Sequence, residues 1–96
     1  MPSPEIIYFT AVWSAPAQAF APVFTEVLAE LGLTGRIADV DLESELTDRC
    51  NIRHVPTVAM STETGIELSE GMRPKAALKQ WISDRLGEPP PPSAKH

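Results

Sequence analysis

The spacing of hydrophobic residues in the first third of the chain predicts a strand followed by a helix. Residues 6–10 form a short apolar run of strand-favouring side chains, which predicts a buried β-strand. Over residues 14–31 apolar side chains recur every three or four positions, which is typical of an amphipathic helix. Ser14 suits the N-cap, Pro16 is tolerated in the first turn, and Gly32 suits the position just after the helix.

Three further segments have the short, β-favouring character of strands. They are residues 36–40, 57–60 and 66–68, and a turn over residues 63–65 separates the last two. Because a helix joins the first two strands of the chain, those strands should be parallel with a right-handed crossover. The last two strands should be antiparallel, because a tight turn joins them.

Two more helices complete the pattern. Leu42, Leu46 and Cys50 are spaced by four, which predicts one buried stripe on a short helix. Pro74 is placed to open a last helix with Leu78, Trp81, Ile82 and Leu86 on one face. The order β-α-β-α-β-β-α predicts an α/β fold in which helices cover both faces of a four-stranded mixed sheet.

Length and composition limit the fold and the classes of partner. The chain has 96 residues, enough for one domain, which we place at residues 4–87. Residues 88–96 include four consecutive prolines and predict a solvated, disordered tail. The net charge is −5, and such an acidic chain lacks the basic surface that binding to nucleic acids or anionic membranes needs, so we expect neither partner. No apolar run approaches a membrane span and no secretory signal is visible, so we expect a cytoplasmic protein.

The chain holds a single cysteine, Cys50. One cysteine cannot form an internal disulfide, a dithiol motif or a cysteine zinc site. Its place on an apolar stripe favours a buried, inert thiol over a regulatory one. The acidic cluster is best explained as a solvated helix start, and no metal-ligand spacing occurs, so we expect neither metal nor cofactor. The acidic residues are Asp39, Asp41, Glu43 and Glu45.

Three short motifs lie at the junctions between the predicted strands, helices and loops. Trp13-Ser14-Ala15-Pro16-Ala17-Gln18 lies where the first strand meets the first helix, Val55-Pro56-Thr57 opens the third strand, and Gly71 follows the fourth. Together they resemble the thioredoxin family, which carries Trp-Cys-Gly-Pro-Cys-Lys at the first of these places. The resemblance covers residues 5–86 and implies a thioredoxin-like fold, in a short form without the N-terminal strand and helix.

The resemblance also assigns positions to the family's functional residues. Ser14 and Ala17 stand where the family has its two redox cysteines, and Tyr8 stands where it has a buried aspartate. Pro22 matches a proline that kinks the helix, and Pro56 matches a cis-proline, so we expect a cis bond there. The residues that would bind substrate are Trp13, at an exposed rim, with Ala15, Pro16, Val55, Pro56 and Gly71.

Disulfide exchange requires a thiolate, and neither Ser14 nor Ala17 supplies one. A Ser14–His54 hydrolase is disfavoured, because no acid is placed to orient the imidazole. The first hypothesis is therefore a redox-inactive chain made by targeted replacement of both cysteines. Its monomeric parent, with Cys-Ala-Pro-Cys, would reduce protein disulfides and be recycled by a reductase.

The second hypothesis is a natural redox-inactive domain that binds an extended peptide. Its main-chain pairing would use Val55 beside Pro56, by strand addition. A third is an assembly module whose contact lies on a helix face.

Overall fold

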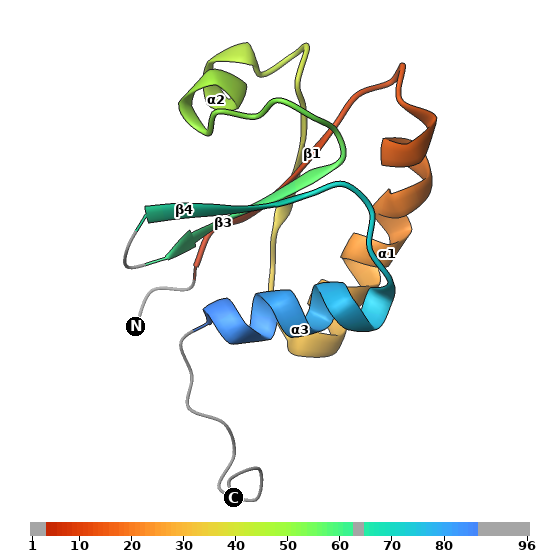
Figure 1. Cartoon of the computed structure of the whole chain (residues 1–96), viewed down its shortest axis with the longest axis vertical. Helices are drawn as coiled ribbons and strands as arrows, with labels where there is room; N and C mark the ends of the chain where they lie inside the picture. Colours follow the sequence, from red (N-terminus) through yellow and green to blue (C-terminus); the bar gives the residue numbers. More distant parts are fainter. Residues whose placement is uncertain (1–3, 63–64, 87–96) are drawn as a thin grey trace, which may run out of the picture.

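The computed structural model describes residues 4–62 and 65–86, and its elements follow the predicted order (Figure 1). They are β1 (Ile6–Thr10), α1 (Ala15–Leu31), β2 (Arg36–Asp39), α2 (Ser44–Arg49), β3 (Thr57–Thr62), β4 (Gly65–Glu70) and α3 (Lys75–Arg85). The predicted tail at residues 88–96 and two residues of the predicted turn, 63 and 64, lie outside the described residues.

The four strands form one mixed sheet in the order β2-β1-β3-β4. β1 is parallel to β2 and antiparallel to β3, and β3 is antiparallel to β4, so the predicted strand directions are confirmed. All five residues of β1 are buried. This central place explains why its sequence is a continuous apolar run rather than an alternation.

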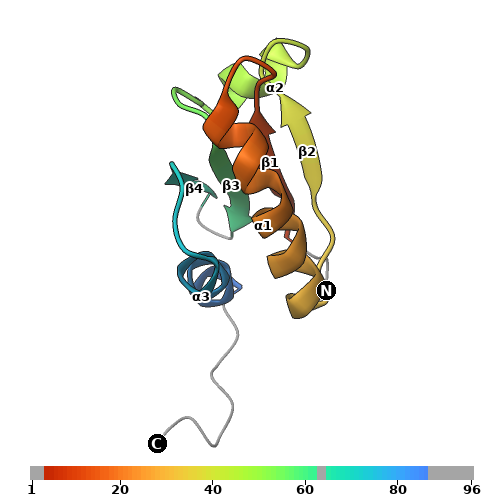
Figure 2. The ribbon, with the colours of Figure 1, turned by 90° about the vertical axis from the view of Figure 1, so that its right-hand side faces the viewer.

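Helices cover both faces of the sheet, as the pattern predicts. Figure 1 shows α2 above the sheet and α3 below it, and Figure 2 shows α1 and α3 packed side by side. Alternate side chains of β1 enter the two cores: Tyr8 packs against Phe20 and Phe24 of α1, while Phe9 faces Cys50 at the end of α2.

The ends of α1 have the caps that the sequence predicts. The Ser14 hydroxyl accepts a hydrogen bond from the Ala17 N–H at 3.2 Å, and Pro16 lies in the first turn. Gly32 ends the helix at a φ of 69°, where a residue without Cβ avoids strain. Pro22 lies inside the helix and has no N–H to continue the hydrogen-bond ladder.

One core prediction is wrong, because Leu42 is 84% exposed. The short helix α2 begins only at Ser44, so the spacing of four from Leu42 to Leu46 does not run along one helix. Leu42 instead lies in the turn after β2, where its N–H bonds to the Asp39 carbonyl. Cys50 is buried as expected, and Trp81 is buried on α3.

Gly35 should be intolerant of a side chain. A Cβ there would lie 2.5 Å from Leu28 Cδ1 and 2.8 Å from the carbonyl oxygen of Ile6, which belongs to the backbone of the central strand. We expect Gly35→Ala to lower the free energy of unfolding by about 1–3 kcal/mol in a urea titration. Thr34→Ala, at the exposed neighbouring position, is the control and should change it by less than about 0.5 kcal/mol. Equal stability of the two variants would contradict this account of the close approach.

Candidate functional site

Strand register gathers the motifs of the sequence at one end of the sheet. Phe9 pairs with Thr57, and Thr57 pairs with Glu70, so the chain after β1, before β3 and after β4 leaves the sheet together. The end of β2 joins them, because it runs parallel to β1. We call this the loop end of the sheet; it lies at the upper right of Figure 1. The sequence-predicted residues Trp13, Ser14, Ala15, Pro16, Val55, Pro56 and Gly71 all lie there.

A hydrogen-bonded pair of loops forms one side of the loop end. The peptide bond between Val55 and Pro56 is cis, and the Pro56 carbonyl accepts a hydrogen bond from the Gly71 N–H at 2.8 Å. Gly71 has a φ of 82°, a conformation that favours glycine. Within residues 4–62 and 65–86, neither the N–H nor the carbonyl of Val55 has a backbone partner. Val55 therefore offers a free donor and acceptor beside a buried proline.

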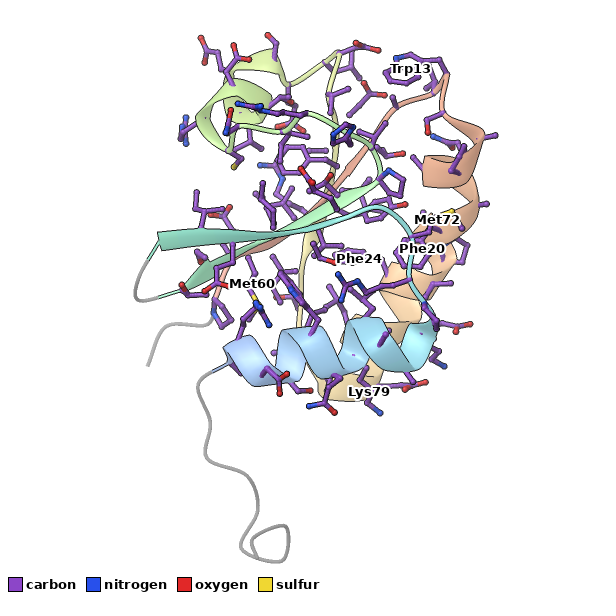
Figure 3. All side chains as sticks on the ribbon, viewed as in Figure 1. Trp13, Phe20, Phe24, Met60, Met72 and Lys79 are labelled. Carbon is purple, nitrogen blue, oxygen red and sulfur yellow. The ribbon has the colours of Figure 1, made fainter. Side chains whose placement is uncertain are left out.

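Trp13 lies at the same end of the sheet, just before the start of α1. Its side chain is 66% exposed, and Figure 3 shows it above the start of α1. The indole N–H donates a hydrogen bond to the Asp41 carboxylate at 2.9 Å, and the Asp41 N–H donates to the Asp39 carboxylate at 2.8 Å. Sequence reasoning treated these acids only as a solvated helix start and missed the contact, because the partners lie far apart in the chain.

Gln18 braces the loop that carries Trp13. Its side-chain amide donates to the Ala11 carbonyl at 2.9 Å and to the Thr10 hydroxyl at 3.3 Å. The Ser14 N–H donates to the same Ala11 carbonyl at 3.1 Å. These bonds hold the strand-to-helix turn in one shape. The only sign of them in the sequence is a polar residue in the first helical turn.

Ser14 stands at the helix N-terminus without a group to activate it. Its only side-chain hydrogen bond in the described structure is the one accepted from the Ala17 N–H. A serine nucleophile needs an adjacent base, and none of the hydrogen bonds of the described residues joins Ser14 to His54. A thiolate at this position would instead be favoured by the free N–H groups and the dipole of α1.

Tyr8 makes the contact that governs position 17. The phenol is fully buried, and its hydroxyl donates a hydrogen bond to the Ala17 carbonyl at 2.6 Å. Burial raises the pKa of Tyr8 to about 12, so the phenol is neutral at physiological pH. Its O–H donates to the backbone carbonyl, and the neutral phenol is not a base that could remove the proton of a neighbouring thiol. Sequence reasoning placed Tyr8 correctly but did not foresee this bond.

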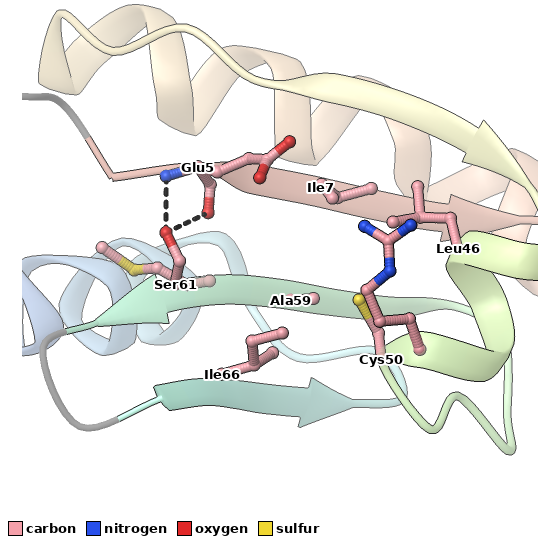
Figure 4. Close-up of a pocket in the computed structure, with 9 residues that line it drawn as sticks. Glu5, Ile7, Leu46, Cys50, Ala59, Ser61 and Ile66 are labelled. Atoms are coloured by element: carbon pink, nitrogen blue, oxygen red, sulfur yellow. Dashed lines mark hydrogen bonds between the residues drawn. The ribbon is translucent and has the colours of Figure 1, made fainter.

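Cys50 lies away from this site. It borders a pocket between α2 and the sheet, with Ile7, Leu46 and Ala59 on its walls (Figure 4). Burial raises the pKa of the Cys50 thiol, which favours the inert role. Among the described residues no group of acidic, histidine and cysteine side chains could hold a metal ion. No helix of that part of the chain is long and apolar enough to cross a membrane.

The buried phenol predicts a pH dependence of stability. A tyrosine loses its proton near pH 10 when unfolded and near pH 12 in this fold, so the unfolded state binds fewer protons between these values. The contribution of Tyr8 is therefore complete below pH 10 and falls by about 1.4 kcal/mol per pH unit between pH 10 and pH 12. Tyr8→Phe should be about 1 kcal/mol less stable at pH 7 and should lose less stability above pH 10. Parallel alkaline denaturation curves for the two proteins would contradict the raised pKa.

The thiol of Cys50 should react slowly in the folded chain. Its burial and raised pKa reduce both access and the thiolate fraction, so iodoacetamide should modify it at least about tenfold more slowly than in urea. Mass spectrometry over time measures the rate, and the unfolded chain is the control. Equal rates in the two states would show that Cys50 is accessible.

Comparisons with known proteins agree with this geometry. The thioredoxin family model matches residues 2–84. The thioredoxin of Bacillus subtilis (strain 168) is 31% identical over 81 residues, which span 81% of this chain and 78% of that protein. Thioredoxin C-2 of Corynebacterium nephridii is 29% identical over 87 residues, 88% of this chain and 81% of that one. Mitochondrial thioredoxin 3 of Saccharomyces cerevisiae, in its oxidized form, superposes with a TM-score of 0.76 at 21% identity, covering 88% of this chain and 80% of that chain, and so shows the same fold. The chain belongs to the thioredoxin family, whose members act on protein disulfides.

Proposed function

We propose that this chain binds extended polypeptide segments at the loop end and does not exchange disulfides. We propose further that a form with cysteines at positions 14 and 17 would use the same surface to reduce protein disulfides. The observation that carries the proposal is the unpaired backbone of Val55, which lies at the same end of the sheet as the exposed ring of Trp13.

The binding part rests on unsatisfied hydrogen-bonding groups. Val55 is half-buried, and its backbone N–H and carbonyl have no backbone partner among the described residues, so both are available to an incoming segment. An extended segment running beside Val55 would pair with both groups by strand addition. Trp13 would contact the segment with its exposed ring, and its indole is already fixed by Asp41, so little side-chain freedom would be lost.

The absence of exchange rests on the placement of the nucleophiles. The one thiol of the chain, Cys50, faces the α2 side of the sheet and has a raised pKa. Ser14 at the helix N-terminus has no base, and Ala17 carries no reactive group. Attack on a disulfide needs a thiolate, so the chain has the binding surface but no thiolate at that surface to carry out the exchange.

The exchange activity of a two-cysteine form rests on the first turn of α1. A thiolate at position 14 would take over the hydrogen bond that the Ser14 hydroxyl now accepts from the Ala17 N–H. A thiol at position 17 would lie one turn deeper in the same helix, within reach of the mixed disulfide. Such a form would be a cytoplasmic monomer recycled by a reductase.

Tyr8 bears on the origin of the two replacements. Deliberate removal of the cysteines would alter positions 14 and 17 and leave the residue beneath them unchanged. Here that residue is a neutral phenol bonded to the Ala17 carbonyl and stacked on Phe24, an arrangement with no proton acceptor for a thiol. This supports natural loss of redox chemistry over targeted replacement. Cysteine codons at positions 14 and 17 of the native gene would overturn that preference.

Reduction of insulin disulfides by dithiothreitol tests the proposal. The unmodified chain should not accelerate the reaction above background. Ser14→Cys combined with Ala17→Cys should accelerate it by more than about tenfold, because both thiols of the exchange are then present. Cys50→Ala in each background is the matched control and should change neither result.

Two outcomes would count against the proposal. Acceleration by the unmodified chain would remove the claim that it cannot exchange disulfides. A folded double variant with no activity would remove the claim that the surface suits a disulfide substrate.

A further inference from the structure

The turn that carries Trp13 is held by polar contacts rather than by burial. Val12 and Trp13 are its two central residues; they are 79% and 66% exposed, and neither belongs to a hydrophobic core of the described structure. The Ser14 N–H closes the turn on the Ala11 carbonyl at 3.1 Å. Apolar packing does not fix the shape of this turn, so its hydrogen bonds must do so.

Gln18 adds a second donor to the same carbonyl. It lies in the first turn of α1, where its backbone N–H donates to the Ser14 carbonyl at 3.0 Å. From this fixed position its side-chain amide reaches back to the Ala11 carbonyl at 2.9 Å and to the Thr10 hydroxyl at 3.3 Å. No other side chain of the described structure binds the backbone of this turn. The amide therefore ties the turn to the start of the helix.

A separate contact holds the indole ring. The Trp13 N–H donates to the Asp41 carboxylate, and the Asp41 backbone is itself held by Asp39 in the turn after β2. Trp13 is thus tied in two ways, by its ring to the turn after β2 and by its backbone turn to α1. A turn that shifts relative to α1 would move the indole away from a carboxylate that is fixed elsewhere. The bonds of Gln18 therefore bear on the bond from Trp13 to Asp41, although they share no atom with it.

We infer that Gln18 is a positioning residue, which holds Trp13 where its ring contacts the extended segment bound at the loop end. This inference rests on the proposed function and names the side chain on which the placement of the ring depends. Gln18 acts through the turn and not by contact with the segment. Its donor bonds keep the turn in one shape before binding, so less conformational freedom is lost when the segment arrives.

Replacement of Gln18 by methionine tests the inference. Gln18→Met keeps the length, neutrality and helix propensity of the side chain but removes both donor bonds. Hydrogen exchange of the two tryptophan indole N–H groups is followed by NMR in the free, full chain. Exchange at Trp13 should become about three- to tenfold faster, because its bond to Asp41 opens more often. Trp81, buried on α3, is the internal reference and should not change.

Peptide binding gives the second measurement. A blocked peptide that alternates valine with serine, titrated by calorimetry, should bind Gln18→Met about three- to tenfold more weakly than the unmodified chain. Gln18→Lys keeps a donor and should leave both the exchange rate and the affinity close to those of the unmodified chain. Gln80→Met is the matched control. It removes an exposed amide that donates to Asp84 within α3 and should change neither result.

The outcomes separate the inference from the proposed function. An unchanged exchange rate at Trp13 in Gln18→Met would overturn the inference, even with a loss of stability in urea, because Gln18 would then act on stability alone. Faster exchange with unchanged affinity would also overturn it, as would an equal effect of Gln80→Met or a failure of Gln18→Lys to preserve both results. No binding of the peptide to the unmodified chain would overturn the proposed function, and the exchange rates would still decide whether Gln18 positions Trp13.

Discussion

The buried hydrogen bond from Tyr8 to Ala17 joins the central strand to the first turn of the long helix, and the character of the site depends on it. The phenol stacks on Phe24 and reaches the Ala17 carbonyl, so it fills the space beneath the helix start. Burial raises the pKa of the phenol and keeps it neutral, and its O–H is used in the hydrogen bond to the Ala17 carbonyl. The helix start therefore keeps the shape that suits a nucleophile at position 14 while lacking a base for position 17. A family member with two cysteines would both bind and reduce its substrate at this surface. In this chain the residues at positions 8, 14 and 17 leave only the binding.

The rest of the site follows from strand register. Phe9 pairs with Thr57, and Thr57 pairs with Glu70, so the loops that follow or precede these strands lie at one end of the sheet. Their common position is set by the strand pairing and does not require contacts between the loops. A few polar bonds then fix the surface locally, among them the bond from Trp13 to Asp41 and the bond from Gly71 to Pro56. Binding needs only this frame, so it can persist when the reactive groups are absent.

Much of this could be predicted from the sequence, for physical reasons that differ by residue. Periodicity finds elements because burial repeats with them, and Ser14 and Gly32 mark the ends of α1 because caps are local. Leu42 was misplaced because spacing cannot show where a short helix begins. The bonds of Tyr8 to Ala17 and Trp13 to Asp41 were missed because they join elements whose relative positions only the fold sets.

Thiol pKa values at the two replaced positions test the separation of binding from exchange most directly. They can be measured by ultraviolet thiolate absorbance in the single variants Ser14→Cys and Ala17→Cys, with the unmodified chain subtracted to remove Cys50. The account predicts that the thiol from Ser14→Cys titrates below the usual value of about 8.5, because the helix start stabilises its anion. The thiol from Ala17→Cys should titrate above that value, because it is buried beside a neutral phenol. A lowered pKa at position 17 would contradict the account, since a proton acceptor would then be present beneath the helix.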